Sequence, residues 1–139
     1  MARSDKYTTT QKQQEFYSDF FPNLTPHPDT GELVRLTNED AVKRSIRNLV
    51  MTNKYERLRN PSIKSNVRKT LFENISPQSA TSLASHIKET ITNNEPRAKL
   101  IDVLVAANED QHMYTVSIIF YVEAIGNPTT LNINLYRVR

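Results

Sequence analysis

The hydrophobic period of the sequence changes once, at Pro96, and this change limits the folds open to the chain. Before Pro96, apolar residues recur at helical spacing, as Val42, Ile46, Leu49 and Val50 do at i, i+4, i+7 and i+8. After it they alternate with polar residues, which is typical of β-strands. Helices followed by strands predict an α+β fold in which about three helices pack on one face of an antiparallel sheet.

Start and stop signals divide the helical part into three helices. A threonine–asparagine pair at 37–38 can cap a first helix that opens with two acidic residues. A short helix is expected over residues 66–73. Ser76 followed by Pro77 is a strong start signal for the third helix. The segment 93–96 ends that helix, because the residue before a proline disfavours the helical region.

Three strands are expected in the last third of the chain. Residues 100–107 are rich in Val, Leu and Ala, and residues 114–123 and 131–136 alternate between apolar and polar side chains. Turn residues at 108–111 and 126–128 separate them. Three consecutive strands joined by short turns predict an antiparallel meander.

Residues 1–37 are expected to form an extended N-terminal arm, and residues 38–139 a single domain. The arm contains a turn signal at 29–31. It also holds five of the eleven aromatic residues, although disordered tails are poor in them. Either Phe16 and Phe20 lie on a short helix that folds back on the protein's own core, or the arm docks on a neighbouring subunit. The sequence leaves both readings open.

Composition excludes several classes of functional site. Without cysteine there is no disulfide, thiolate nucleophile or zinc finger, and two glycines, Gly31 and Gly126, cannot form a glycine-rich phosphate loop. His27, His86 and His112 lie in different elements without ligand spacing, so we expect no metal and no cofactor. No apolar stretch reaches the ~18 residues of a membrane helix, and we expect neither a signal peptide nor a membrane contact.

Three acidic residues near the ends of elements are the candidates for acid–base catalysis: Glu73, Glu95 and Asp102. Glycoside hydrolysis needs two carboxyl groups that face each other across a cleft. The sequence does not pair any of the three in this way, and acids at helix ends are usually solvated. We therefore expect the protein not to be an enzyme.

Positive charge is concentrated in residues 43–69, which contain nine basic residues and one acid, Glu56. An excess of this size attracts an acidic partner, either a nucleic acid or an acidic protein surface. Tyr55 is the only aromatic residue in this segment, so it does not offer a stacking platform for single strands. A solvated helix face is the simpler alternative.

Four blocks of sequence, in order, resemble a known family. Residues 38–52 (NEDAVKRSIRNLVMT) resemble its opening helix, 71–77 (LFENISP) its middle motif, 94–97 (NEPR) its Glu-Pro-Arg signature and 135–139 (LYRVR) its terminal strand. The family is the lysozyme-like baseplate wedge proteins of contractile phage tails, typified by a small wedge subunit of phage T4. It includes the corresponding baseplate protein of type VI secretion systems. Segment 55–61 keeps the Glu-Arg of the family's first loop but lacks its glycines.

The resemblance implies a structural wedge subunit that anchors and nucleates the tail sheath through protein–protein contacts. It implies a place in the virion, in the tail baseplate near the tail tube, after assembly in the host cytoplasm. Two alternatives remain. The family label suggests a peptidoglycan-degrading, lysozyme-like enzyme, and the basic segment 43–69 is compatible with a nucleic-acid-binding module. We expect contacts with other wedge subunits and sheath subunits, and none with nucleic acid.

The resemblance also implies that particular charged residues of this chain form ion pairs, either within the chain or with partners. Pro96 holds Glu95 and Arg97 in a defined relation at the corner between helix and strand. Their opposite charges then pair locally or across an interface. The basic residues expected to meet acidic groups on wedge partners are Lys43, Arg44, Arg47, Arg57 and Arg59.

The last strand is expected to lie at an edge of the sheet. An edge strand normally carries charge or proline that prevents pairing with other chains, and residues 131–136 carry neither. The resemblance supplies a partner, since sheath subunits extend arms that add strands to neighbouring sheets. The alternative is that the arm or another strand covers this edge. The contacting residues would be Leu131, Asn132, Ile133, Asn134, Leu135 and Tyr136.

Overall fold

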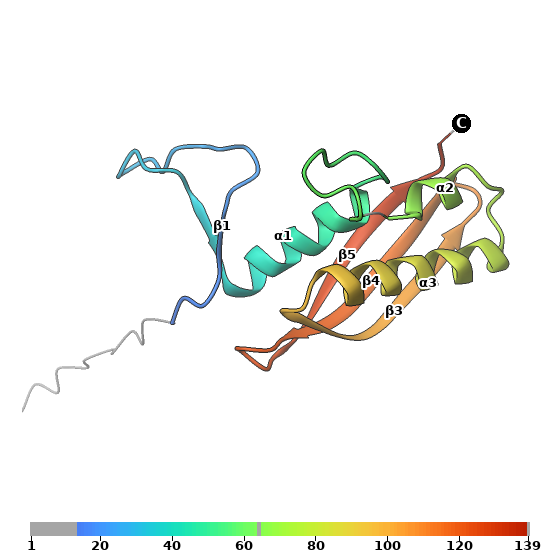
Figure 1. The fold of residues 1–139 in the computed structure, drawn as a ribbon. Helices are drawn as coiled ribbons and strands as arrows, with labels where there is room; N and C mark the ends of the chain where they lie inside the picture. The colour runs from blue at the N-terminus through green and yellow to red at the C-terminus, as the bar shows by residue number, and fades with distance from the viewer. Residues whose placement is uncertain (1–13, 64, 139) are drawn as a thin grey trace, which may run out of the picture.

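The protein folds into a three-stranded antiparallel sheet with its helices on one face (Figure 1). This computed structural model describes residues 14–63 and 65–138. The predicted α+β class is confirmed, and so is the order of helices before strands. The elements in chain order are β1 (Ser18–Phe20), β2 (Arg35–Thr37), α1 (Asn38–Met51), α2 (Val67–Leu71), α3 (Pro77–Asn94), β3 (Ala98–Asn108), β4 (Met113–Val122) and β5 (Pro128–Tyr136).

The sheet is the predicted meander, with strand order β3-β4-β5 and β4 in the centre. Ile118 of β4 lies opposite Val103 of β3 and Leu131 of β5. The register between β4 and β5 is regular. The register between β3 and β4 shifts between Leu100 and Asp102, which marks a bulge. The two edges of the sheet are therefore formed differently.

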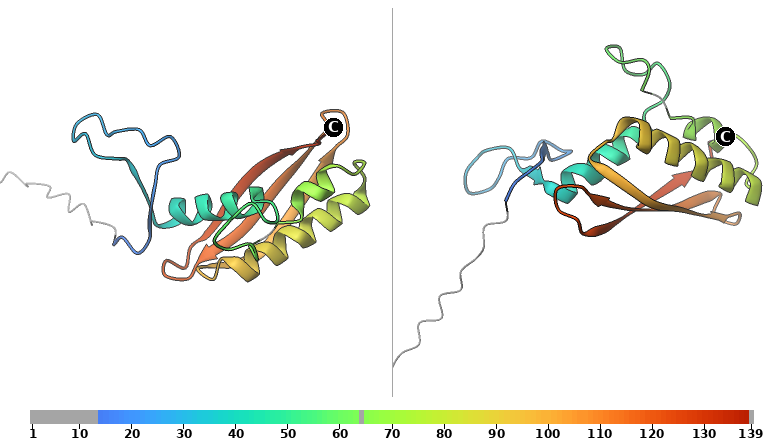
Figure 2. Two further views of the ribbon diagram at one scale, coloured as in Figure 1. Left: turned by 45° about the horizontal axis from the view of Figure 1, so that its top comes forward. Right: turned by 60° about the horizontal axis from the view of Figure 1, so that its bottom comes forward.

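The hydrophobic core lies between the sheet and the two long helices. The α3 helix lies over β3, and α1 lies over β4 and β5 (Figure 2). Alternation along β4 buries one side chain in two, because successive strand residues point to opposite faces. The core side chains with no more than 4% exposure from these elements include Val42, Ile46, Leu83, Ile87, Ile91, Tyr114, Val116, Ile118, Phe120, Val122, Ile133 and Leu135.

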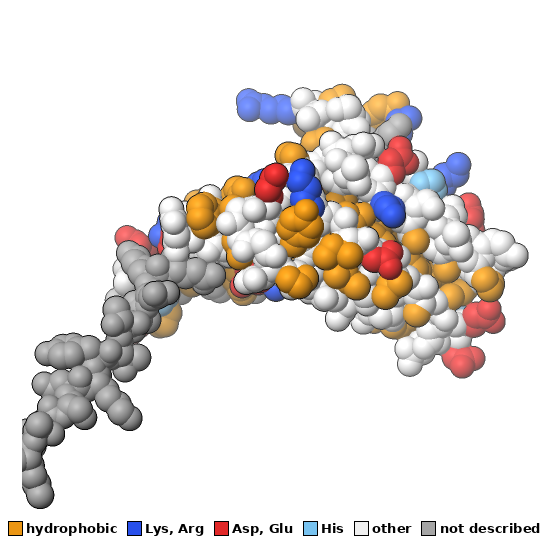
Figure 3. Space-filling model, turned by 90° about the horizontal axis from the view of Figure 1, so that it is seen from below, with side chains coloured by type: hydrophobic (Ala, Val, Ile, Leu, Met, Phe, Trp, Pro, Cys, Tyr) orange, Lys and Arg blue, Asp and Glu red, His pale blue; other side chains and the backbone are white. Residues whose placement is uncertain are grey.

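Several large apolar side chains remain exposed outside this core. Ile101 and Leu104 on β3 and Tyr136 on β5 are more than half exposed. Figure 3 shows hydrophobic side chains gathered across the middle of the face seen from below. Exposed apolar surface of this kind is typical of interaction sites.

Both predicted helix starts are confirmed. Thr37 is the N-cap of α1 in an extended conformation, and Ser76 caps α3 in a reciprocal capping box with Ser79. The Ser79 hydroxyl also lies 2.7 Å from the hydroxyl of the fully buried Tyr114. This contact fixes the start of α3 against the centre of the sheet.

The described part of the arm, residues 14–37, contains a two-stranded ribbon that projects beyond the start of α1 (Figures 1 and 2). Strand β1 pairs with β2, so that Phe20 lies opposite Arg35. The alternative of a short helix through Phe16 and Phe20 is therefore wrong, and both side chains are about half exposed rather than packed in the core. Strand pairing and the first residue of α1 hold this segment extended. Docking of the arm on a neighbouring subunit stays a prediction.

Asn38 anchors the ribbon to α1. Its Oδ1 accepts a hydrogen bond from the Phe16 amide at 2.9 Å, and its Nδ2 donates to the Gln14 carbonyl at 3.0 Å. Its φ is +50°, a left-handed conformation that asparagine tolerates better than most residues. Residue 38 therefore needs both an amide side chain and an unusual backbone.

Replacing Asn38 should separate these two requirements. Asn38→Gly should lose the side-chain hydrogen bonds, and Asn38→Ala should also strain the backbone by roughly 1–2 kcal/mol. We expect faster hydrogen exchange at the Phe16 amide in both variants, and a lower free energy of unfolding for alanine than for glycine. The exposed Asn48→Ala is the matched control. Equal stability of the alanine and glycine variants would contradict the backbone argument.

Candidate functional site

The corner between α3 and β3 holds a buried carboxylate. Glu95 is 3% exposed. Arg97 Nε donates to its Oε1 at 2.6 Å and Arg97 Nη2 to its Oε2 at 2.8 Å. The Ser45 hydroxyl, on α1, donates to Oε2 as well. The structure thus pairs Glu95 with Arg97 within the chain, while Pro96 between them stays exposed.

The hydrogen bonds keep this carboxylate ionised. Burial by itself raises the pKa of Glu95, but the hydrogen bonds from Arg97 and Ser45 outweigh burial and lower the pKa below its ordinary value. The hydrogen bond between Arg97 and Glu95 also raises the pKa of Arg97. Two parallel N–H···O bonds to one carboxylate are the strongest form of such a pair. The corner is therefore held by an ion pair with two hydrogen bonds, in which both side chains stay ionised.

The corner is also linked to the arm. The Arg97 guanidinium lies 5.3 Å from the centroid of the Tyr17 ring, within the range of a cation–π interaction. Next along the arm, Asp19 lies 3.5 Å from Arg44 Nε of α1. Ser45, Tyr17 and Asp19 could not be predicted as parts of this network, because they lie far from Glu95 along the chain.

Strand β5 presents a free edge in the described part of the chain, since the sheet ends there. The Arg137 amide donates to the His112 carbonyl at 2.9 Å, next to the β4–β5 ladder. Because bonded and non-bonded pairs alternate in antiparallel ladders, residues 131, 133 and 135 bond to β4. Asn132 and Asn134 consequently direct both backbone groups away from the sheet.

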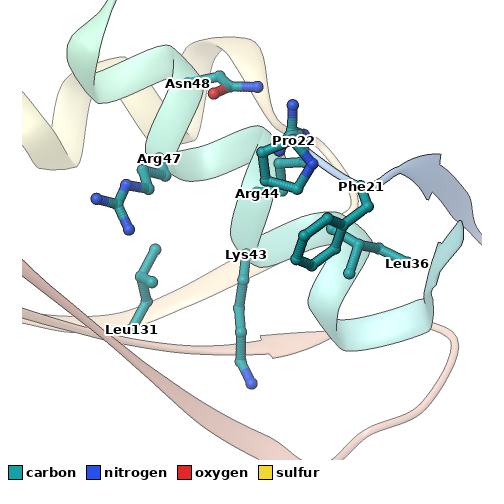
Figure 4. A pocket seen from close by; sticks show the side chains of 8 residues that line it. All are labelled: Phe21, Pro22, Leu36, Lys43, Arg44, Arg47, Asn48 and Leu131. Carbon is teal, nitrogen blue, oxygen red and sulfur yellow. The ribbon is translucent and has the colours of Figure 1, made fainter. Parts of the chain in front are cut away.

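Basic side chains of α1 line a hollow beside this edge (Figure 4). The hollow has a volume of about 520 Å³. Lys43, Arg44 and Arg47 approach it from α1, and Leu131 rises toward Arg47 from β5 (Figure 4). The remaining lining residues are Phe21, Pro22, Leu36 and Asn48. Two groups predicted separately from the sequence, the basic helix face and the last strand, thus lie together.

Arg57, which was predicted with Arg44 and Arg47, does not line this hollow. It lies exposed in the loop after α1, next to Leu58, whose side chain is 97% exposed. This loop contains Glu56 and Arg57, the Glu-Arg pair that segment 55–61 has in common with the family's first loop. Its Glu56 carboxylate accepts a hydrogen bond from the Asn53 amide at 2.7 Å, which closes a turn.

The three acids considered for catalysis do not share a cleft lining. Glu73 and Asp102 are exposed, and Asp102 accepts a hydrogen bond from the neighbouring Val103 amide at 2.8 Å. Among residues 14–63 and 65–138, no three His, Asp or Glu side chains group as metal ligands. None of the helices in this part of the chain is long and apolar enough to cross a membrane.

Comparisons with known proteins agree with the family predicted from the sequence. The family model described as baseplate wedge protein gp25 matches residues 37–126, well over half of the chain. The matched region ends before β5, so the terminal block 135–139 lies outside it. No curated protein is significantly similar to this chain in sequence.

Two solved structures have a similar fold. A Geobacter sulfurreducens protein described as a tail lysozyme has a TM-score of 0.67 and 22% sequence identity, over 73% of this chain and 92% of that one. A chain of the anti-feeding prophage baseplate has a TM-score of 0.58 and 24% identity, over 88% and 86% of the two chains. At these identities the likeness establishes the fold alone.

The pH dependence of stability should report the Glu95 network. Because the native pKa is lowered, the unfolded state binds more protons between the two pKa values, so the stabilisation is present at neutral pH and is lost as pH falls from the ordinary glutamate pKa through the lowered native pKa. Glu95→Gln should flatten this dependence and, at pH 7, lower the free energy of unfolding by about 1–3 kcal/mol. Urea unfolding between pH 3 and 7 measures both effects.

Glu123→Gln is the matched control, since Glu123 is exposed and lies 3.9 Å from Lys99. We expect it to change stability little. A wild-type pH profile that Glu95→Gln leaves unchanged would contradict an ionised, stabilising carboxylate.

Proposed function

Because the chain belongs to the gp25 family of baseplate wedge proteins, we propose that it is a structural subunit of a contractile-tail baseplate, in a phage or a related injection machine. In this proposal it anchors and nucleates the tail sheath through protein–protein contacts. It acts in the tail baseplate of the virion, near the tail tube, and is assembled in the host cytoplasm. The likeness to a baseplate chain supports the same role.

The observation that carries the proposal is the free edge of β5. Asn132 and Asn134 direct backbone N–H and C=O groups outward, and residues 131–136 lack charge and proline. Exposed edges without such protection pair readily with other chains. An extended arm of a sheath subunit would add a strand here, with backbone pairing providing affinity and side chains setting the register.

The remaining surfaces are proposed to bind other wedge subunits. Arg57 lies on an exposed loop, where an acidic group of a partner can reach it. The exposed ring of Pro96 offers a rigid contact point beside the Glu95–Arg97 pair. We propose that the positive charge of this chain meets acidic protein surfaces rather than nucleic acid or membrane.

A lysozyme-like activity is the alternative that the fold raises, and the state of Glu95 opposes it. A general acid in glycoside hydrolysis needs a raised pKa so that it is protonated at neutral pH. The hydrogen bonds from Arg97 and Ser45 lower the pKa of Glu95 instead. Because these bonds already occupy both oxygens, the carboxylate is a structural group.

Blocking the β5 edge should separate baseplate assembly from sheath assembly. Asn132→Pro removes one outward donor and leaves the bonds to β4 intact, because proline is tolerated where its nitrogen faces away from the sheet. We expect baseplates that assemble but carry no sheath, as counted by electron microscopy of complementing particles. Asn132→Ala, which keeps the backbone donor, is the control and should form sheath normally. Normal sheath on Asn132→Pro baseplates would refute strand addition at this edge.

The purified protein should not degrade peptidoglycan. A turbidity assay on purified cell walls should show no clearing above buffer, because the candidate acids form no catalytic pair. Clearing that is abolished by Glu73→Gln or Glu95→Gln, in variants with intact folds, would overturn the structural reading.

A further inference from the structure

Two hollows lie against the same edge of the sheet. The first, described above, is lined by Leu131 of β5, and the second by Leu135, four residues further along the strand. Both side chains belong to the row that faces the helices, since Leu131, Ile133 and Leu135 alternate with exposed residues. At ~3.3 Å per residue the two hollows are about 13 Å apart along the strand.

The first hollow combines an apolar wall with one available cation. Lys43 lies 3.2 Å from Asp40, and Arg44 lies 3.5 Å from Asp19, so both have acidic neighbours within the chain. Arg47 is exposed, and it has no carboxylate within ion-pair distance in the described part of the chain. A carboxylate entering this hollow could pair with Arg47, and a cation would be repelled by the charge of Arg47.

The second hollow is predominantly apolar. It has a volume of about 270 Å³ and lies between the end of α1, α2 and the end of β5. Its lining includes the exposed Met51 and Tyr136, and its basic residue is Arg68. The remaining lining residues are Val50, Asn53, Val67, Leu71, Asn134, Leu135 and Val138. This space fits one large aliphatic or aromatic side chain.

An added strand would direct side chains into both hollows at once. It would bond to the outward groups of Asn132 and Asn134, and in either direction its residues beside Leu131, Ile133 and Leu135 would form one row; in an antiparallel strand these are the close, non-bonded pairs. Side chains of such pairs lie on the same face of the sheet. The positions beside Leu131 and Leu135 are four residues apart in the added strand, with one residue beside Ile133 on the same face between them.

We infer that the β5 edge selects an extended segment of another protein that carries an acidic side chain four residues from a large apolar one. The acidic side chain pairs with Arg47 in the first hollow, and the apolar side chain fills the second. This inference rests on the proposed strand addition and deepens it, because it assigns the acidic group that α1 meets to the added strand itself. Backbone pairing supplies general affinity, and the two hollows supply register and partner choice.

Short fluorescent peptides of alternating Thr and Val test the inference by anisotropy with the whole chain. One peptide has Glu followed by Leu four residues later, and a second reverses their order, because the strand can add parallel or antiparallel. We expect one of the two to bind. Changing its Glu to Lys, or its Leu to Ser, should weaken binding roughly tenfold each, the loss typical of one charge-assisted bond or one buried side chain.

Variants of the protein assign the effect to Arg47. Arg47→Glu should reverse the preference, so that the Lys peptide binds more tightly than the Glu peptide. Arg59→Glu, a charge reversal in the loop after α1, should leave the preference unchanged. If Arg59→Glu has the same effect as Arg47→Glu, general charge attraction explains binding and the inference is wrong. It is also wrong if neither peptide order binds.

Asn132→Pro distinguishes failure of the inference from failure of the proposed function. If this variant abolishes binding but the Glu and Lys peptides bind the wild type equally, strand addition holds and the two-hollow selection is refuted. If Asn132→Pro binds every peptide as the wild type does, the peptides do not add to β5 and both claims fail. If Asn132→Pro loses binding and the wild type prefers the Glu peptide in a way that depends on Arg47, both claims are supported.

Discussion

The buried Glu95 carboxylate constrains the rest of the structure, because an ionised group with 3% exposure is stable only with partners in defined positions. One partner, Arg97, follows from the local turn at Pro96. The other, Ser45, belongs to α1, so the carboxylate fixes α1 against the corner between α3 and β3. With α1 in this position, its basic side faces outward beside β5. The contact of Arg97 with Tyr17 then brings the arm to the same region.

The two edges of the sheet differ in a way that matters for function. Strand β3 carries a bulge between Leu100 and Asp102, and it lies under α3. Bulges and charges on an edge discourage pairing with other chains. Strand β5 keeps a regular register with β4 and carries no charged residue or proline over residues 131–136. The arm contributes to this site through Phe21 and Pro22, which line the first hollow without pairing with β5.

Local signals in the sequence were sufficient for most of the fold. The change of period at Pro96, the cap at Ser76 and the turn residues predicted the helices and the meander, because each depends on neighbours in the chain. The arm was harder to predict, since Phe16 and Phe20 have helical spacing. Their extended conformation depends on residues far along the chain, because the Phe16 amide donates to Asn38 Oδ1 and Phe20 pairs with Arg35. For the same reason the sequence identified the Glu95–Arg97 pair but not Ser45, and identified Arg47 and Leu131 without indicating that they share one hollow.

The central claim is that a strand from another protein completes the sheet at β5. A cryo-electron map of the assembled baseplate, at a resolution that traces backbone, tests it most directly. The account predicts density for a foreign strand hydrogen-bonded to Asn132 and Asn134, with one side chain beside Arg47. A β5 edge that faces solvent in the assembled particle, or a foreign strand paired with β3 instead, would contradict it.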